Sequence, residues 1–388
     1  MQSLRDLCAG KRVLIVSTIR SDMRSGGDTA TRALLEGLGA TQEVRLLKCA
    51  PAASTGGPML TFLLANAPAF VFVALARLTE RVSFEFFGRA SLLFLMRCLW
   101  AKLVTQPDLV IFNHHSSFIF SRLFSASRVA MIWHDVPSLK RSRLLDRSSR
   151  DSRCCAAIQS HLLRPGVRSF TFSVTEARLL RRFHGANVGL LPAIRPVARQ
   201  TGLCARRAGV LLLVGNWHRE ENRAGAAVFF DTLARRSSQA KGDCRIDQII
   251  VAGTGANLVA RRVAQPQAGR PDIIVVDRFE NLNQFDACAL VAPILQGAGI
   301  KIKTLEAWSH SIPVLGTPQA FSGLAPSVWA QGGLRFRSIA QLVAYCCSDF
   351  TRDPSFLALN PSRAMDVYLD QTGGSGDASA DTAVEVRA

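Results

Sequence analysis

Short apolar strands alternate with helical stretches along almost the whole chain, and this alternation runs through two separate series. The first series begins in the run KRVLIVST, and its strands are expected at residues 13–17, 108–112, 128–133, 170–174 and near 188–191. Short strands rich in β-branched residues and separated by helices indicate a parallel sheet that is covered by helices on both faces. The alternation therefore predicts an α/β fold.

The pattern breaks after Pro192, in a segment rich in Pro, Arg and Gly, and then starts again. Strands are expected in GVLLLVG, DQIIVAG, DIIVVD, CALVAPI and IPVLGT, with helices in NRAGAAVFFDTLARR, LNQFD and KTLEAWSH. A length of 388 residues also favours two lobes over one. We expect a first domain at 1–195, a linker at 196–208, a second domain at 209–370 and a flexible tail at 371–388 that lacks an apolar face.

The chain carries a net charge of +18, from 47 Lys and Arg against 29 Asp and Glu. Such an excess attracts anionic partners, including phosphates and acidic lipid headgroups. The basic residues are scattered in pairs such as Arg181-Arg182 and Arg261-Arg262, without the dense or aromatic-interleaved block of an RNA or DNA module. We therefore expect no nucleic-acid partner, while an Arg-rich surface without a function and a membrane-surface role both stay open.

Two apolar stretches bear on where the protein works. Residues 59–78 are long enough to cross a bilayer but contain an Asn and a Pro, and residues 91–104 are interrupted by Arg97 and Lys102. Buried helices, membrane-facing helices with basic rims and a true span all stay open for these stretches. The ten cysteines include no C-x-x-C, and no signal peptide is apparent. We expect a cytoplasmic protein, with peripheral contact to an anionic inner-membrane surface as the open alternative.

The run VAPILQGAGIKIKTLEA combines several features of an anion-binding site. Gly297 and Gly299 let the backbone approach an anion closely and direct N–H groups at it. A helix is expected next, and the N-terminus of a helix favours negative charge. Lys301 and Lys303 add cations there, and Glu306, one turn beyond Lys303, can accept hydrogen bonds from two vicinal hydroxyls. The run suits a sugar diphosphate with a ribose attached, and solvated lysines on an ordinary glycine turn are the alternative.

The pattern G-A-G-x-x-x-K-x-L-E-A, followed by I-P-V-L-G-T, resembles the nucleotide-sugar motif of retaining glycosyltransferases with the GT-B fold, in particular the large family four. In that family a Glu on the helix binds the ribose hydroxyls, a position that Glu306 matches. A Lys near the phosphates is matched by Lys303. The resemblance is specific over 209–324 and general over the N-terminal lobe. It implies a GT-B architecture, with two Rossmann-like doubly wound domains facing across a cleft.

The sequence departs from the family at one position. Many members carry E-x7-E, whose first acid contacts the donor sugar, but the residue eight positions before Glu306 is Ala298. The resemblance then implies that backbone N–H groups around Ala298 make this contact. The run VGNWHREENRAG places Asn222 at a recurrent Asn of the family, facing the donor phosphates. Arg219 or Arg223 would supply a cation whose planar fork contacts phosphate oxygens, and an ordinary charged surface loop is the alternative.

The N-terminal lobe matches the family more weakly. Gly26 and Gly27 follow the first strand, as the acceptor-side glycine loop does in the family, and a plain turn is the alternative. His134 and Asp135 end a strand in MIWHDVPS and resemble a histidine pattern found near the reaction centre of related enzymes. We expect His134 near the donor sugar, and a purely structural histidine is the alternative. The pair His114-His115, after the preceding strand, competes for this role.

The resemblance as a whole implies a glycosyltransferase that moves a sugar from a nucleoside diphosphate sugar to an acceptor hydroxyl with retention. His134, Lys303 and Glu306 are the expected catalytic residues, and the cation would stabilise charge on the leaving diphosphate. The apolar, basic N-terminal stretch suggests a saccharide or lipid-linked acceptor, as in bacterial exopolysaccharide or lipopolysaccharide synthesis. There is no D-x-D pair and no P-loop, so we expect no metal and no other cofactor. A GT-B protein that only binds sugar nucleotides and a sugar-nucleotide epimerase stay open.

Overall fold

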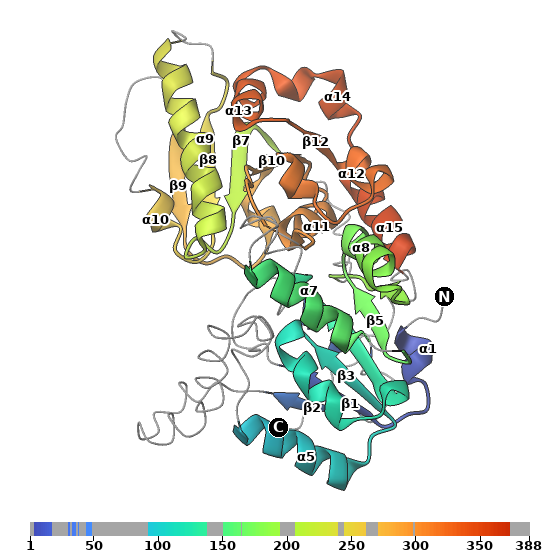
Figure 1. Cartoon of the computed structure of the whole chain (residues 1–388). Coiled ribbons are helices and arrows are strands. Elements are labelled where there is room, and N and C mark those ends of the chain that lie inside the picture. Colours follow the sequence, from blue (N-terminus) through green and yellow to red (C-terminus); the bar gives the residue numbers. More distant parts are fainter. Residues whose placement is uncertain are drawn as a thin grey trace, which may run out of the picture. The chain divides into compact units, whose positions relative to one another are not determined.

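The computed structural model describes residues 4–17, 30–31, 33–35, 38, 44–48, 92–137, 150–163, 165–194, 206–239, 244–260, 271–297 and 299–372 of the chain. The chain divides into two compact units, of which one ends at Ala193 and the other begins at Ile194. Each unit contains a six-stranded sheet whose paired strands all run parallel (Figure 1). The α/β fold class predicted from the alternation of strands and helices is confirmed.

The sheet of the first unit has the strand order β2-β1-β3-β4-β5-β6, so the order reverses direction between β1 and β3. The segment of β2 was not among the expected strands. The strands are β1 (Val13–Ser17), β2 (Val44–Lys48), β3 (Leu109–Asn113), β4 (Val129–Trp133), β5 (Arg168–Thr171) and β6 (Val188–Leu190). The helices are α1 (Leu4–Cys8), α5 (Leu92–Thr105), α7 (Arg150–Leu162) and α8 (Val174–His184), with 3-10 helices η2 (His115–Leu123) and η3 (Ala126–Arg128).

One buried cluster joins β1, β3 and β4 to the helices α5, η2, α7 and α8. Its largest side chain is Trp133, whose ring meets the ring of Phe118 edge-on at a centroid distance of 4.6 Å. Phe94 of α5 meets Phe120 of η2 in the same way at 4.9 Å. Such edge-to-face aromatic pairs stabilise a core beyond their burial alone. The first pair packs η2 against β4, and the second packs α5 against η2.

The fourth expected strand of the first unit is shorter than the sequence pattern predicts. It ends at Thr171, and the helix α8 begins already at Val174. The reason is a helix cap: the Ser173 hydroxyl accepts a hydrogen bond from the backbone N–H of Glu176 at 3.2 Å. A serine before a helix satisfies one of its unpaired N–H groups, and this local bond outweighs the β propensity of the valine.

The sheet of the second unit has the order β12-β11-β10-β7-β8-β9, which reverses between β7 and β10. The strands are β7 (Arg207–Val214), β8 (Gln248–Ala252), β9 (Asp272–Val276), β10 (Ala287–Ala292), β11 (Val314–Gly316) and β12 (Gly333–Arg335). The helices are α9 (Glu220–Gln239), α10 (Asn257–Ala260), α11 (Ile302–Ser309), α12 (Pro326–Gly332), α13 (Ile339–Cys347), α14 (Pro354–Leu357) and α15 (Pro361–Thr372), with 3-10 helices η4 (Leu282–Phe285), η5 (Pro318–Phe321) and η6 (Phe350–Arg352).

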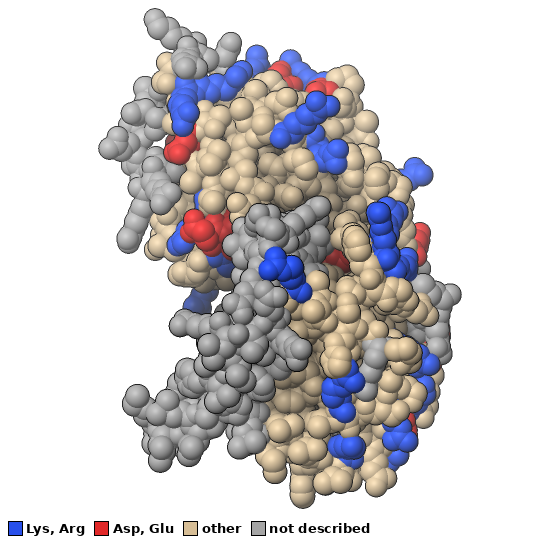
Figure 2. Space-filling view, viewed as in Figure 1, with Lys and Arg blue, Asp and Glu red and all other residues tan. Residues whose placement is uncertain are grey.

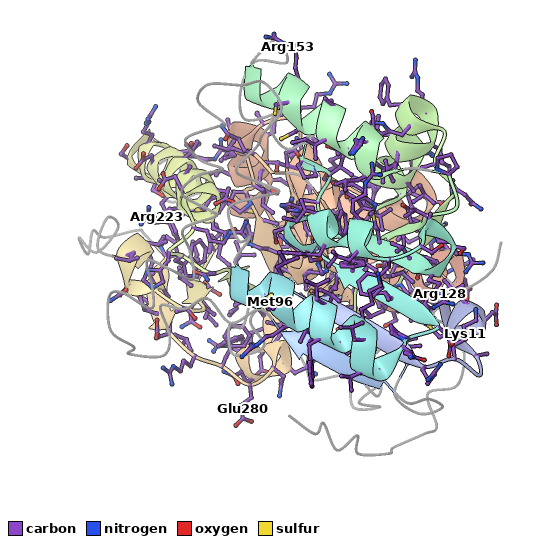
Figure 3. All side chains as sticks on the ribbon, turned by 60° about the horizontal axis from the view of Figure 1, so that its bottom comes forward. Lys11, Met96, Arg128, Arg153, Arg223 and Glu280 are labelled. Carbon is purple, nitrogen blue, oxygen red and sulfur yellow. The ribbon has the colours of Figure 1, made fainter. Side chains whose placement is uncertain are left out.

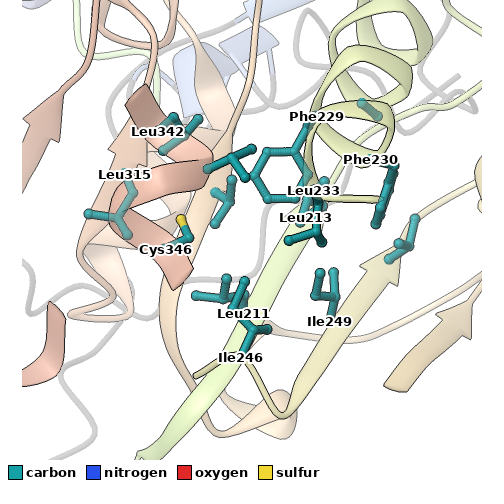
Figure 4. Close-up of a cluster of buried hydrophobic side chains, with 14 of the residues drawn as sticks. Leu211, Leu213, Phe229, Phe230, Leu233, Ile246, Ile249, Leu315, Leu342 and Cys346 are labelled. Carbon is teal, nitrogen blue, oxygen red and sulfur yellow. The ribbon is translucent and has the colours of Figure 1, made fainter. Parts of the chain in front are cut away.

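The core of the second unit lies between its sheet and the helices α9 and α13 (Figure 4). Leu211 and Leu213 of β7 point into it, together with Phe229 of α9 and Leu342 of α13. These strand residues are two apart, as expected for side chains on one face of a strand. β7 begins within the linker expected at 196–208, and α15 ends within the tail expected at 371–388. Most of both segments lies outside the described residues, and the expected domain boundaries stay predictions.

The structure describes only one of the two apolar stretches. The first, at 59–78, lies outside the described residues. Most of the second forms the helix α5, which buries Phe94, Cys98 and Ala101 against the first unit. Among the described helices, none has both the length and the apolar character that a bilayer crossing requires.

Candidate functional site

The second unit places its predicted site residues at the point where its strand order reverses. β7 and β10 are neighbours there, and the segments after Val214 and Ala292 leave the sheet at the same edge. Parallel sheets of this kind bind ligands beyond the carboxyl ends of their strands at this reversal. The first segment leads into α9 and the second passes Gly297 on the way to α11.

Lys303 is the centre of a hydrogen-bonded group at this edge. Its Nζ donates to Oδ1 of Asn222 at 3.0 Å, and Nδ2 of Asn222 donates to the backbone oxygen of Asn216 at 2.8 Å. The same ammonium lies 6.0 Å from the ring centroid of Trp217, which is buried. The structure thus brings together Lys303 and Asn222, two residues predicted from separate runs of the sequence. Asn216 and Trp217 belong to the site but were not predicted.

Burial changes the charge behaviour of this lysine. The pKa of Lys303 is lowered to about 7, chiefly by loss of hydration and then by the nearby cations Lys301 and Arg219, while Glu306 and Glu221 oppose the shift. Desolvation disfavours the charged form of an amine, and so do like charges. At neutral pH the Lys303 amine is therefore only partly protonated. An anion at the site would raise its pKa and hold the proton.

Two glycines keep the backbone close around this group. A Cβ on Gly215 would lie 3.3 Å from Asn222 and 3.4 Å from Lys303 Nζ, tight against both side chains. A Cβ on Gly225, in the first half of α9, would lie 1.8 Å from the carbonyl oxygen of Pro293, which no side chain could tolerate. Gly225 therefore permits α9 to pack directly on the segment that follows β10.

The glycine run before α11 has the backbone conformation that its composition predicts. Gly297 and Gly299 have φ values of 132° and 71°, in a region that favours glycine. Ala298 between them lies outside the described residues. Lys301 is the N-cap residue of α11 and provides no side-chain cap, and its ammonium lies beside Gly297. A helix N-terminus and a lysine are thus placed next to each other, as an anion site requires.

Glu306 lies on α11 one turn beyond Lys303. It is half-buried, and burial raises the pKa of its carboxyl above the usual range, with Lys303 opposing the shift. Within the part of the chain that the structure describes, no hydrogen bond to this carboxylate contributes to the shift. A partly desolvated carboxylate of this kind can accept hydrogen bonds from a ligand that carries hydroxyl groups.

The two arginines of this region lie at its solvent side. Arg219 pairs with Glu221 at 2.9 Å, and Arg223 pairs with Glu220 in the first turn of α9. Exposed pairs of this kind contribute little to stability and exchange readily for other partners. Arg219 also adds to the positive potential at Lys303. The structure places both arginines beside the site, and their contact with phosphate stays a prediction.

The carboxyl edge of the first sheet holds a second, separate group. The His134 ring donates from Nε2 to Oδ1 of Asn113 at 2.7 Å, and the amide nitrogen of Asn113 donates to Ser17 and Thr31. These bonds fix the orientation of the Asn113 amide and with it the protonated nitrogen of the His134 ring. Asn113 is fully buried and was not predicted, although a polar residue at the end of the apolar strand LVIF is a signal that could have identified it.

The His134 imidazole is neutral at physiological pH. Burial lowers its pKa to about 4, Asp135 opposes this shift and His115 adds to it. The ring of His114 lies 5.8 Å from that of His134, and Phe172 lies 4.9 Å from it on the β5 side. Asp135 follows directly and is half-buried. Gly26 and Gly27, predicted for the same edge, lie outside the described residues.

His114 marks a strained point at the end of β3. Its φ is 84° and its ψ 136°, a conformation that residues with a side chain rarely adopt. Its ring accepts a hydrogen bond from the backbone N–H of Ser116 and caps η2. Strain of this kind persists where the surrounding structure requires it, and it is frequent at functional sites. His114 thus lies beside His134, and which of the two contacts a ligand stays a prediction.

Comparisons with known proteins give a fold but no family. No protein-family model matches the sequence, and no curated protein matches it. Sucrose-phosphate synthase from Thermosynechococcus elongatus is similar in structure with a TM-score of 0.61 at 14% identity, over 93% of this chain and 95% of that one. Anabaena HepE, in complex with UDP and glucose, gives 0.57 at 12% identity over 92% and 95%. WaaG, a glycosyltransferase involved in lipopolysaccharide biosynthesis, gives 0.51 at 13% identity over 93% and 96%.

The likeness extends over both units, because more than nine tenths of each chain is covered. Identities this low identify the fold and leave the reaction open. The chain thus has the GT-B fold, with two α/β domains that each contain a parallel six-stranded sheet.

Proposed function

We propose that this protein is a glycosyltransferase that takes a sugar from a nucleoside diphosphate sugar and attaches it to an acceptor hydroxyl with retention of configuration. The observation that carries the proposal is the group around Lys303. Lys303, held by Asn222, lies in the first turn of α11, and Glu306 follows one turn beyond Lys303. Lys301 at the start of this helix lies beside Gly297. These cations and the helix N-terminus would suit a diphosphate, and the carboxylate would suit the ribose hydroxyls.

The chemistry of the proposed reaction requires stabilisation of a leaving diphosphate. As the bond from the sugar to phosphate breaks, negative charge develops on the phosphate oxygens. Lys303 and the N-terminus of α11 would bind these oxygens, and preorganised donors in a partly desolvated site act strongly on developing charge. Glu306 would hold the ribose hydroxyls. His134 would contact the donor sugar as a neutral hydrogen-bonding group, and no metal would be needed.

The partners of the reaction follow from the same proposal. HepE was crystallised with UDP and glucose, and UDP-glucose is therefore the first donor to test. WaaG acts in lipopolysaccharide biosynthesis, and a saccharide or lipid-linked acceptor in bacterial polysaccharide or lipopolysaccharide assembly would suit this chain as well. A lipid-linked acceptor would bring the protein to the inner face of the cell membrane.

Calorimetric titration with UDP-glucose tests the proposal at Glu306. Replacing Glu306 with Ala should weaken donor binding about 10- to 150-fold, the equivalent of the 1.5–3 kcal/mol typical of a hydrogen bond to a charged group. The fold should be unaffected, because the carboxylate lies at the edge of the core. The matched control is Glu280→Ala, which removes an exposed glutamate elsewhere in the second unit. A folded Glu306→Ala protein with unchanged donor affinity would contradict the assignment.

The reaction itself needs a separate measurement. Release of UDP from UDP-glucose in the presence of a saccharide acceptor should depend on Lys303, and the anomeric configuration of the product should match that of the donor. Donor binding without release under any acceptor would favour a protein that only binds sugar nucleotides. If UDP-glucose does not bind, thermal shifts with a panel of nucleoside diphosphates identify the base, because a specific ligand stabilises the folded protein.

A further inference from the structure

The helix α5 has two apolar faces that differ in burial. Phe94, Cys98 and Ala101 are buried against the first unit, where Phe94 meets Phe120 edge-on. The opposite face is apolar but exposed: Met96, Trp100, Leu103 and Val104 keep 56%, 69%, 71% and 54% of their surface accessible.

These exposed apolar side chains form a stripe. At 3.6 residues per turn, Met96, Trp100 and Leu103 follow one another along one side of the helix. Of the ten large hydrophobic side chains exposed among the described residues, four lie on this helix of 14 residues. Single exposed hydrophobic residues are common on proteins, but a contiguous exposed patch marks an interaction surface.

The surroundings of the stripe are basic. Arg97 and Lys102 are exposed on its two flanks, and the sequence of α5 contains no acidic residue. Figure 3 shows Met96 near one end of α5, and Lys11 and Arg128 near the opposite end of this helix. Lys and Arg also outnumber Asp and Glu on the face seen in Figure 2, in line with the net charge of +18.

We propose that α5 docks this protein onto an anionic lipid surface. The helix would lie in the plane of the headgroups, with Met96, Trp100 and Leu103 inserted among the upper acyl chains and Arg97 and Lys102 against the anionic groups. Amphipathic interfacial helices combine these two contacts, and tryptophan favours this depth because its ring is apolar while its N–H is polar. The proposal does not depend on the transfer reaction.

Charge favours a lipid surface over a second copy of the chain. A two-fold contact between two α5 stripes would bring Arg97 and Lys102 of one copy near the same residues of the other, without an acid on the helix to offset the repulsion. Anionic headgroups would instead neutralise these side chains. Burial of the apolar stripe and Coulomb attraction then act in the same direction.

Vesicle flotation of the full chain tests the proposal. Vesicles of phosphatidylcholine with phosphatidylglycerol should carry the protein to the top of a gradient, and vesicles of phosphatidylcholine alone should carry much less. The combined variant Met96→Ser, Trp100→Ser and Leu103→Ser should lower partitioning about 100-fold, because three apolar side chains no longer insert. The matched control, Phe183→Ser with Val228→Ser and Leu357→Ser, removes exposed apolar side chains from three other helices and should float like the unaltered protein.

Fluorescence gives an independent readout at a single residue. All five tryptophans lie among the described residues, and Trp100 is the exposed one. Its emission should shift to shorter wavelength on acidic vesicles and be quenched by lipids brominated in the acyl chains. Trp100→Phe should keep flotation and lose most of the quenching. Raising the salt from about 0.1 to 1 M shortens the Debye length from about 10 to 3 Å. This should weaken binding of the unaltered protein more than binding of the variant Arg97→Gln with Lys102→Gln, which has less Coulomb attraction for salt to screen.

Three results would overturn the proposal. In the first, the unaltered protein stays at the bottom of the gradient at every salt concentration. In the second, the α5 variant floats as well as the control. In the third, sedimentation shows that the unaltered protein is a dimer and the α5 variant a monomer, and neither protein binds vesicles. The stripe would then be a contact between two copies of the chain. Flotation that depends on α5 in a protein without transfer activity would support docking and count only against the proposed reaction.

Discussion

The carboxyl edges of the two sheets are both formed by the ends of parallel strands, but they carry different polar side chains. In the second unit, the edge holds an ammonium, Lys303, bound by the amide of Asn222 and followed by the carboxylate of Glu306. In the first unit, it holds an imidazole, His134, bound by the amide of Asn113. In both groups an asparagine fixes the titratable side chain. The edges differ in the charge that this side chain can carry.

Burial lowers the pKa of both titratable groups, with different consequences. The pKa of Lys303 falls to about 7, so this group can gain a full positive charge when an anion arrives at neutral pH. The pKa of His134 falls to about 4, so its ring stays neutral across the physiological range. The same physical effect makes one site responsive to a charged ligand and keeps the other a fixed neutral donor and acceptor. We expect the second unit to bind phosphate and the first to bind uncharged groups.

The largest effect is expected at the ammonium. Lys303→Ala should slow sugar transfer roughly 30- to 1000-fold, because losing one charge-stabilising contact to a leaving group typically costs about 2–4 kcal/mol of barrier. Steady-state kinetics with UDP-glucose measures this effect, and thermal unfolding of the same variant should show a far smaller change. A turnover within tenfold of the unaltered protein would make Lys303 a structural partner of Asn222 and remove the contrast between the two edges.

The pH dependence of donor binding should follow the same lysine. The protonated form binds the diphosphate, and the complex holds the proton above the pKa of about 7 that Lys303 has in the free protein. Affinity for UDP-glucose should therefore be level below pH 7 and fall by up to about tenfold for each further pH unit. Calorimetry in buffers of different ionisation enthalpy should detect proton uptake above pH 7. Lys303→Ala should show neither effect, and a pH-dependent affinity in that variant would assign the titration to another group.

A smaller effect is expected at the imidazole. His134→Ala removes a neutral hydrogen-bonding group, worth about 0.5–1.5 kcal/mol, so turnover should fall roughly 2- to 10-fold. Affinity for UDP itself should not change, because UDP lacks the sugar that His134 is proposed to contact. The comparison is made by titrating UDP and UDP-glucose into the same variant. Loss of UDP affinity would mean that His134 acts on the nucleotide, and the division of labour between the edges would fail.

No effect is expected from chelation of metal ions. If Lys303 and the N-terminus of α11 supply the positive charge, transfer in excess EDTA should proceed at the rate measured with added Mg²⁺ or Mn²⁺. The assay uses protein treated with EDTA and then freed of it, with each ion added back. Restoration of activity by one ion alone would show that this cation has a metal partner.

Local patterns determined much of what the sequence could predict. β1 runs over the expected residues 13–17, and most other expected strands agree with the structure within one or two residues. Periodicity and turn chemistry are local properties, so they can be read from neighbouring residues. The positions of Lys303 and Glu306 on one helix after a strand follow from the same patterns. The short strand β2 was missed because its run, EVRLLK, carries too few apolar residues to stand out.

Only the tertiary structure decided which of these segments meet. Asn222 and Lys303 are 81 residues apart, and their hydrogen bond exists because β7 and β10 are neighbours in the sheet. Gly225 fits because α9 packs on the carbonyl of Pro293, a contact without any sequence signal. The helix α5 is the sharpest case. Its sequence is apolar on nearly every side, and only packing determined that Phe94 is buried and Trp100 exposed, because burial depends on neighbours that are distant in the chain.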